Sequence, residues 1–185
     1  FHPAEEINSY RLPAYHLIDI KNYLFDYNGL PTIYLETSRG CNHNCAFCSN
    51  VPLKNRWVPM SAEYSVNNIE FLYNRYNIKS FHLIDLDFFF DLERVRRFCR
   101  LLLEKGLKVS WHNQGVRVAE MFDMDDEFVQ LLKESGFREF EAIGTESGSQ
   151  RIVDLMGKQY KIEKAVSLNR KFARHKIPMR YNFMI

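Results

Sequence analysis

Hydrophobic and polar positions follow two different periods along the chain. Short β-rich apolar segments predict strands, and longer segments with apolar residues every three to four positions predict helices. The predicted strands cover residues 32–37, 80–85, 107–112, 137–144 and 178–185. The predicted helices cover residues 61–77, 91–106, 124–135, 149–156 and 161–175. This alternation is typical of an α/β protein with a parallel sheet, which right-handed crossovers wind into a barrel or an open layer.

The predicted helix ends carry suitable capping residues. Ser61 and Asp91 can accept hydrogen bonds from the first free amides of two helices, and Gly106 and Gly136 can end helices. Cys99 lies on the apolar side of the second helix and is interpreted as a buried hydrophobic residue. The basic residues of that helix are interpreted as a solvated face rather than a nucleic-acid contact: Arg94, Arg96, Arg97 and Arg100.

Composition and charge exclude several classes of protein. The 185 residues are 46% hydrophobic, which is enough for a packed core. The 25 basic residues are balanced by 23 acidic residues, so no basic field for nucleic acid is expected. No signal peptide opens the chain, and no apolar run is long enough to span a membrane. We therefore expect a cytoplasmic protein that acts on a small-molecule substrate.

Residues 1–30 stand outside the strand–helix alternation. They are rich in Tyr and contain the turn signal Asn28-Gly29, and we interpret them as an ordered lead-in that packs against the sheet. The chain starts without Met and stops inside the last predicted strand. We therefore expect a fragment with two parts. Residues 1–30 form a linker from a missing N-terminal domain, and residues 31–185 form a barrel domain that is incomplete at its carboxyl end.

Three of the four cysteines form a compact motif. Cys41, Cys45 and Cys48 have the spacing C-x3-C-x2-C directly after the first predicted strand, and parallel α/β folds place active sites at the carboxyl ends of strands. Three thiolates can hold three corners of a 4Fe–4S cluster and leave the fourth iron open to a small molecule. A zinc site is the alternative, but structural zinc usually has four ligands, and no second cysteine pair is present.

The segment from Glu36 through Cys48 closely resembles the signature of the radical S-adenosylmethionine (SAM) superfamily. Its Arg39-Gly40-Cys41 lead-in is similar to the branch that often carries an N-terminal cobalamin-binding domain. Two further stretches, residues 86–89 and 143–149, resemble the same superfamily. The resemblance implies a partial parallel (β/α) barrel whose sixth strand follows Ile185.

The resemblance also implies an activity and its cofactors. A 4Fe–4S cluster on Cys41, Cys45 and Cys48 would bind SAM at its open iron. A reducing donor such as flavodoxin or ferredoxin would then allow cleavage of SAM to a 5′-deoxyadenosyl radical, which abstracts hydrogen from the substrate. The branch points to a methyltransferase or a cyclase, with cobalamin bound in the full-length protein.

Further site residues follow from the same resemblance and from strand ends. The resemblance implies that Phe47 packs on the adenine of SAM, that Glu146 accepts hydrogen bonds from its ribose with Ser147 nearby, and that Asp87 approaches its methionine part. Glu146 could instead cap the helix near Ser149, and Asp87 could cap the second helix with Asp91. The residues proposed to face the substrate or SAM lie at or near ends of strands: His112, Arg117 and Asn182.

Three other interpretations stay open. His82 lies in the middle of a strand and is interpreted as a core residue with its hydrogen bonds satisfied. A methylthiotransferase-like enzyme that modifies RNA or protein would share the cysteine motif. A non-catalytic zinc or iron–sulfur module would need a fourth protein ligand and would not bind SAM.

Overall fold

A computed structural model describes residues 7–49 and 56–185 of the chain. Within these residues, one sheet has the strand order β1-β2-β5-β6-β8-β7, and β9 pairs with β8. Every pairing in this sheet is parallel except that of β1 with β2. The strands are β1 (Phe25–Tyr27), β2 (Leu30–Leu35), β5 (Ser80–Leu83), β6 (Ser110–Asn113), β7 (Val116–Arg117), β8 (Phe137–Glu146) and β9 (Met179–Phe183).

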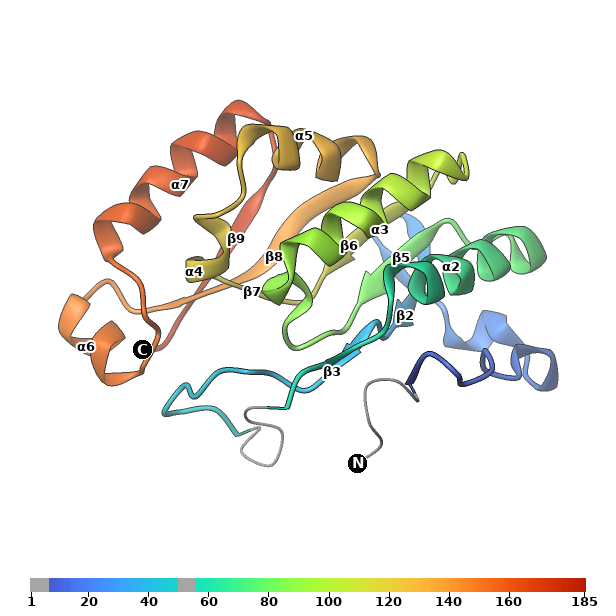
Figure 1. Ribbon diagram of the computed structural model, residues 1–185, viewed down its shortest axis with the longest axis horizontal. Helices are drawn as coiled ribbons and strands as arrows, with labels where there is room; N and C mark the ends of the chain where they lie inside the picture. Colours follow the sequence, from blue (N-terminus) through green and yellow to red (C-terminus); the bar gives the residue numbers. More distant parts are fainter. Residues whose placement is uncertain (1–6, 50–55) are drawn as a thin grey trace.

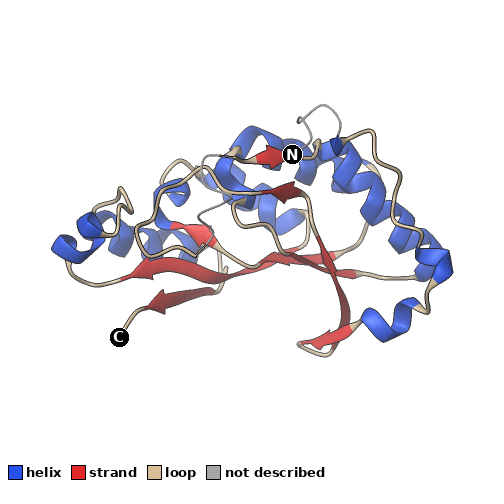
Figure 2. Cartoon of the chain, turned by 90° about the horizontal axis from the view of Figure 1, so that it is seen from below, coloured by secondary structure: helices blue, strands red, loops and turns tan. Residues whose placement is uncertain are grey.

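Helices cover one face of this sheet. Figure 1 shows the four long helices side by side in front of the strands, and Figure 2 shows the opposite face of the sheet without helices. The long helices are α2 (Ala62–Tyr76), α3 (Leu92–Glu104), α5 (Asp126–Glu134) and α7 (Ile162–Arg174). The shorter elements are α4 (Val118–Met121), α6 (Gln150–Leu155), η1 (Tyr15–Leu17), η2 (Ile20–Tyr23) and η4 (Phe88–Phe90), with β3 (Ser38–Arg39) paired to β4 (Val58–Pro59). The result is a curled half-barrel, as the strand–helix alternation predicts.

Aromatic side chains fill the space between sheet and helices. The strand register places Ile33 beside Phe81 and Phe81 beside Trp111 on the helix-covered face. Trp111 satisfies its indole N–H by donating to the Ser135 carbonyl at 3.1 Å. Each such buried side chain contributes about 1.5–3 kcal/mol of hydrophobic free energy. The other large aromatic residues of this core are Phe88, Phe89, Phe98, Phe128, Phe137, Phe140 and Phe172.

The predicted capping residues are confirmed. The Ser61 hydroxyl accepts from the Tyr64 amide at 3.1 Å, and the Asp91 carboxylate accepts from the Arg94 amide at 3.0 Å. Gly136 has a φ of +97°, and a Cβ there would lie 2.0 Å from the Val109 carbonyl oxygen. Only glycine fits this position, because both the backbone conformation and the close approach exclude a side chain.

Several short elements are not predicted by the sequence pattern, among them β1, β7 and α4. β1 joins the edge of the sheet through a tight hairpin at Asn28 and Gly29, whose φ values are +52° and +81°. β7 and α4 follow β6 directly, where only a loop was expected. Each of these elements has two to four residues, which is too short to show a period. Residues 1–6 of the expected lead-in lie outside the described residues. Among the residues that are described, no helix combines the length and the hydropathy needed to cross a membrane.

A cysteine loop at the carboxyl ends of the strands

The three motif cysteines lie in one irregular loop that follows β3. Cys41, Cys45 and Cys48 are all partly exposed free thiols. The loop turns on itself where the Cys48 amide donates to the Cys45 carbonyl at 3.2 Å. Cys99, by contrast, is buried in the core on α3, as predicted. The sulfur-bearing loop is therefore open to a ligand while the fourth cysteine is not.

A buried acid fixes the chain just before this loop. Asp85 follows β5 and accepts hydrogen bonds from the Thr37 amide at 3.1 Å, the Thr37 hydroxyl at 3.0 Å and the Ser38 hydroxyl at 2.5 Å. Burial raises the pKa of Asp85 to about 6, although these donors and Arg94 favour its ionised form. The register of the β3 segment thus depends on a side chain from the neighbouring βα unit.

Arg94 belongs to the same network, which corrects the interpretation of its helix face as wholly solvated. Its guanidinium donates to the Thr37 carbonyl at 2.6 Å and to the Met60 carbonyl at 2.7 Å. Arg94 lies in the first turn of α3, which reaches the β3–β4 ribbon, whereas Arg97 pairs with Glu63 in solvent. The helical period places both Arg94 and Arg97 on the polar side of α3. It therefore could not show that only Arg94 contacts the β3–β4 ribbon.

His43 holds the cysteine loop to two other parts of the sheet. Its Nε2 lies 3.0 Å from Asp87 Oδ2 and 3.0 Å from Glu120 Oε1. Its Nδ1 contacts the Arg117 guanidinium. Burial lowers the pKa of His43, but the hydrogen bonds to Asp87 and Glu120 outweigh it and raise the pKa to about 8, so Nε2 carries a proton for these two acids. Burial raises the pKa of Glu120 to about 7.

Two of the predicted site residues therefore meet at His43. Asp87 also lies 3.7 Å from the Cys41 sulfur, and it is almost fully buried rather than capping a helix. Arg117 additionally donates to the Lys158 carbonyl at 3.0 Å. Burial raises the pKa of the Cys41 thiol to about 11. Metal binding replaces that thiol proton, so a free Cys41 stays protonated until a metal arrives.

A second group of predicted residues is joined by a lysine that sequence reasoning missed. Lys158 Nζ lies 3.0 Å from Glu146 Oε1 and 5.4 Å from the centre of the Phe47 ring. Lys158 is buried, and the missing side chain of Gly144 makes room for it, since a Cβ there would lie 2.8 Å from Nζ. No local motif marks Lys158, because its role depends on residues that are far away in sequence.

The structure also locates the remaining residues near Glu146. Glu146 has a φ of +66°, and its carboxylate pairs with Lys158 instead of capping α6. The Ser147 hydroxyl accepts from the Ser149 amide at 3.1 Å. Asn182 on β9 is exposed and lies in register with Gly144. Phe47, Glu146, Ser147 and Asn182 thus lie on or beside one end of the β8–β9 pair.

His112 lies elsewhere, inside β6 and on the face of the sheet without helices. It is fully buried, with Nε2 2.9 Å from His82 Nδ1 and its ring stacked 3.8 Å from the Tyr27 ring. His82 Nε2 has no hydrogen-bond partner, so the prediction of a fully satisfied core residue is wrong. Tyr27 of β1, a strand that was not predicted, packs edge-on against the His82 ring, and its hydroxyl donates to Glu139 instead.

The buried state of His112 predicts a pH dependence of folding. Burial, with smaller contributions from His82 and Arg180, lowers the pKa of His112 to about 4, whereas an unfolded His has a pKa of about 6.5. The unfolded chain therefore binds the extra proton first, and stability is lost as the pH falls from about 6.5 towards 4. We expect His112→Gln to remove about 2 kcal/mol of the stability loss between about pH 7.5 and about pH 5. Urea unfolding in the presence of a chelator, repeated across this pH range, measures the unfolding free energy. A His112→Gln protein with the same pH dependence as the unchanged protein would contradict the prediction. Substitution of the exposed His16 by Gln is the control.

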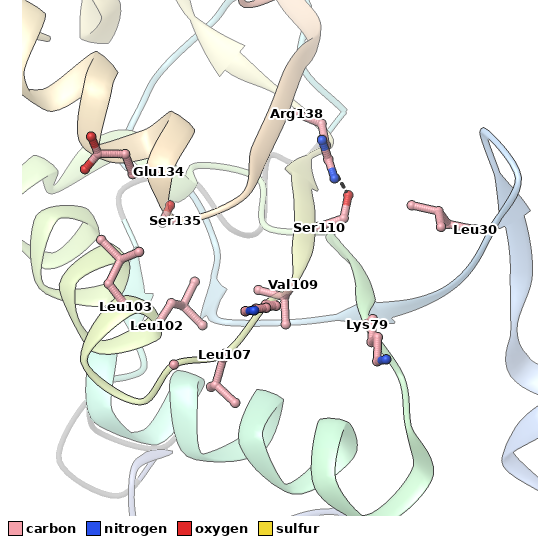
Figure 3. A pocket seen from close by; sticks show the side chains of 12 residues that line it. Leu30, Lys79, Leu102, Leu103, Leu107, Val109, Ser110, Glu134, Ser135 and Arg138 are labelled. Atoms are coloured by element: carbon pink, nitrogen blue, oxygen red, sulfur yellow. Dashed lines mark hydrogen bonds between the residues drawn. The ribbon is translucent and has the colours of Figure 1, made fainter.

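A cavity of about 550 Å³ lies at the other end of the strands. It is bounded mainly by aliphatic side chains of α3 and the segment after it, and Arg138 donates to Ser110 at its wall at 2.8 Å (Figure 3). Its residues Lys79 and Ser110 mark the amino ends of β5 and β6. The cavity contains none of the predicted site residues, so it is not the site that the cysteine motif indicates.

The donor set of the loop fits an iron–sulfur cluster better than zinc. Cys41, His43 and Asp87 offer atoms within 4.8 Å of one another and could together hold an ion. Both ring nitrogens of His43 are, however, already engaged by Arg117 and by the two carboxylates. The described residues therefore supply three cysteine sulfurs without a free fourth ligand, which suits a cluster with one open iron.

Comparison with known proteins agrees with this site. The chain is 28% identical over 176 residues to an uncharacterised methyltransferase of Pyrococcus horikoshii, covering 92% of this chain and 37% of that protein. It is 30% identical over 176 residues to cytidylyl-2-hydroxyethylphosphonate methyltransferase of Streptomyces wedmorensis, covering 89% and 32%. It is 26% identical over 149 residues to anaerobic magnesium-protoporphyrin IX monomethyl ester cyclase of Cereibacter sphaeroides, covering 80% and 24%. The chain thus spans little more than a third of these relatives, or less.

A solved structure gives the same result. The cobalamin-dependent S-adenosylmethionine radical enzyme OxsB superposes with a TM-score of 0.69 at 25% identity, over 82% of this chain and 23% of that one. The Radical SAM superfamily matches residues 35–185, which include the cysteine loop and every residue of the candidate site. The half-barrel, the three-cysteine loop and this match together establish that the chain belongs to the radical SAM superfamily.

Proposed function

We propose that this chain is the core of a cobalamin-dependent radical SAM enzyme that transfers a methyl group to a small molecule. The observation that carries the proposal is the loop of three partly exposed cysteines at the carboxyl ends of the strands. Cys41, Cys45 and Cys48 would hold a 4Fe–4S cluster. Such a cluster supplies the electron that cleaves SAM to methionine and a 5′-deoxyadenosyl radical.

The residues around the loop would shape the cluster site. Asp85 and Arg94 form hydrogen bonds with Thr37, just before β3. His43 connects the cysteine loop to Asp87 and Glu120. The buried carboxylate of Asp87 contacts the Cys41 sulfur, and we propose that it lies next to the methionine part of SAM. The loop is thus held in shape by side chains rather than by regular backbone pairing.

Phe47, Lys158 and Glu146 would form the nucleoside part of the SAM site. Phe47 is 44% exposed, so its ring can pack on adenine. The Glu146 carboxylate can accept from the ribose hydroxyls, with the Ser147 hydroxyl beside it. Lys158 acts as a positioning residue, because it holds Glu146 in place and spans to the Phe47 ring. Arg117 and Asn182 would contribute to the surroundings of the substrate or SAM, whereas His112 is fully buried among other residues.

Two methyltransferase relatives, which cover 92% and 89% of this chain, support methyl transfer. Three cyclase relatives, which cover 74–87% of this chain, keep ring closure as a second candidate. Cobalamin would bind in a separate domain, since the chain covers 23% of the cobalamin-dependent OxsB chain. SAM that is isotopically labelled in its methyl group separates the two reactions. A methyltransferase places the label in its product, whereas a cyclase does not.

The proposal is tested on the full-length protein, reconstituted anaerobically with iron and sulfide. We expect a reduced-cluster electron paramagnetic resonance signal that shifts when SAM is added, and 5′-deoxyadenosine as a product.

Gly144→Ala should displace the Lys158–Glu146 pair and weaken SAM binding about tenfold, with little change in the unfolding free energy. Gly148→Ala is the matched control, because a Cβ there meets nothing within 4 Å. Two results would overturn the proposed function. One is a cluster signal that is the same with and without SAM, and the other is tight binding of zinc with no cluster formed.

A further inference from the structure

A second group of metal-binding side chains lies on the face of the sheet without helices. His82, His112 and Glu141 come from three different strands, β5, β6 and β8. Their ligand atoms all lie within 4.8 Å of one another. Glu141 Oε2 is 3.5 Å from His82 Nε2 and 3.8 Å from His112 Nε2. None of these residues takes part in holding the cysteine loop.

The strand register brings these three residues together. His82 and His112 are direct partners in the parallel pairing of β5 with β6. The pairing of β6 with β8 shifts register between Trp111 and Asn113. Phe137 and Phe140 therefore both pack into the core, and Glu141 is turned towards the two histidines. A register irregularity that redirects a side chain is frequent next to functional sites.

The group has unmet bonding capacity. Among the described residues, six buried side-chain polar atoms lack a hydrogen-bond partner, and three of them are His82 Nε2, His112 Nδ1 and Glu141 Oε2. The His82 side chain is 9% exposed and the His112 side chain is 0% exposed. Each unpaired buried polar atom costs about 1–3 kcal/mol. His82 Nε2 and Glu141 Oε2 lie 3.5 Å apart, so one ion bound between them would satisfy both atoms. His112 Nε2 lies 3.8 Å from the same carboxylate oxygen and can join them as the third ligand.

Residues around the His82–His112–Glu141 group hold its side chains in place, as residues adjacent to metal ligands commonly do. Tyr27 stacks on the His112 ring and donates its hydroxyl proton to Glu139 at 2.6 Å. Arg180 in turn pairs with Glu139 at 2.9 Å. Glu139 is therefore neutralised by its own partners, and Glu141 stays available as the single carboxylate for the two histidines.

We propose that His82, His112 and Glu141 bind a divalent first-row transition-metal ion, such as Zn²⁺ or Fe²⁺, separately from the cysteine loop. Two imidazoles and one carboxylate are a ligand set that these ions accept, and they leave coordination positions open. The single carboxylate offsets half of the charge of a divalent ion, and the Glu141 side chain is 27% exposed, so water can screen the remaining charge. In the metal-free protein the two imidazoles share the His112 Nε2–His82 Nδ1 hydrogen bond, which metal binding would replace. The open positions suit a substrate group that carries an oxygen or nitrogen donor.

The test uses the full-length protein with Cys41, Cys45 and Cys48 all replaced by serine, so that no thiolate of the loop can bind metal. Anaerobic titration with Co²⁺ should show one equivalent bound, with weak visible d–d absorption and without sulfur-to-cobalt charge transfer. Glu141→Gln and His82→Gln should each weaken Co²⁺ binding more than about tenfold. His175→Gln is the control, since His175 pairs with Asp126 at the surface.

Two results would overturn the proposal. One is a folded protein, judged by circular dichroism, that binds no Co²⁺ beyond what the His82→Gln protein binds. The other is Co²⁺ binding that both the Glu141→Gln and the His82→Gln proteins retain. The two variants remove different ligands from different strands. If one of them does not fold, Co²⁺ binding retained by the other is sufficient to overturn the proposal. Because the cysteines are absent, neither result bears on the radical SAM activity.

Discussion

Replacing Cys45 with alanine is expected to abolish both cluster binding and formation of 5′-deoxyadenosine. A 4Fe–4S cluster with one open iron has only three protein sulfurs, so losing one leaves two irons without a protein ligand. Outer residues of metal sites already cost 10–100-fold when changed, and a direct ligand should cost more than about 100-fold. Iron and sulfide analysis, together with quantified 5′-deoxyadenosine, measures the effect.

Cys99→Ala is the matched control for this experiment. It also removes one thiol, but that thiol is buried on α3 and does not belong to the loop. We expect its iron content and product formation to equal those of the unchanged protein. Equal losses in the Cys45 and Cys99 variants would mean that the loop is not the cluster site.

Replacing Asp85 with alanine should lower the unfolding free energy by about 3–5 kcal/mol. Asp85 accepts from Thr37 and Ser38, and Arg94 lies half-buried in the same network. The substitution leaves buried donors without partners and a partly buried guanidinium without its counter-charge. Urea unfolding of the metal-free protein measures the loss.

The control for Asp85 is Glu104→Ala. Glu104 pairs with Arg97 on the exposed side of α3, where a salt bridge contributes at most about 1 kcal/mol. A loss below about 1 kcal/mol for Asp85→Ala as well would show that the β3 segment is held by other contacts. Asp85→Ala should also lower the iron content after reconstitution, because β3 leads directly into the loop.

The long elements could be predicted because each follows a single period. α2, α3, α5 and α7 carry one apolar face each, and their observed bounds differ from the predicted ones by only a few residues. The cap at Ser61 and the required glycine at Gly136 were visible for the same reason, since both are local. The cysteine motif was equally local and led to the superfamily that the comparisons establish.

The contacts that organise the site could not be predicted in this way. Lys158 carries no motif, and its partners come from the cysteine loop (Phe47) and from the end of β8 (Glu146). His43 lies inside the cysteine motif without a pattern of its own, yet its ring contacts Glu120 from α4. Arg94 and Asp85 are both polar residues without a pattern of their own. Such residues acquire roles only when the topology brings distant segments together.

The anchoring of the cysteine loop has a consequence for how the enzyme matures. The contacts of Cys41 with Asp87, and of His43 with Arg117 and Glu120, span 46, 74 and 77 residues. Contacts of such long range form late, because the chain entropy of closing large loops must be overcome first. We therefore expect the loop to take its final shape only after the strands from β2 to β7 in the sheet order have assembled. Iron that arrives during synthesis would encounter three thiols of an unfolded segment. Iron that arrives after folding would encounter a loop that is already in its final shape. A cluster bound by this loop would thus stabilise a fold that has already formed rather than start its folding.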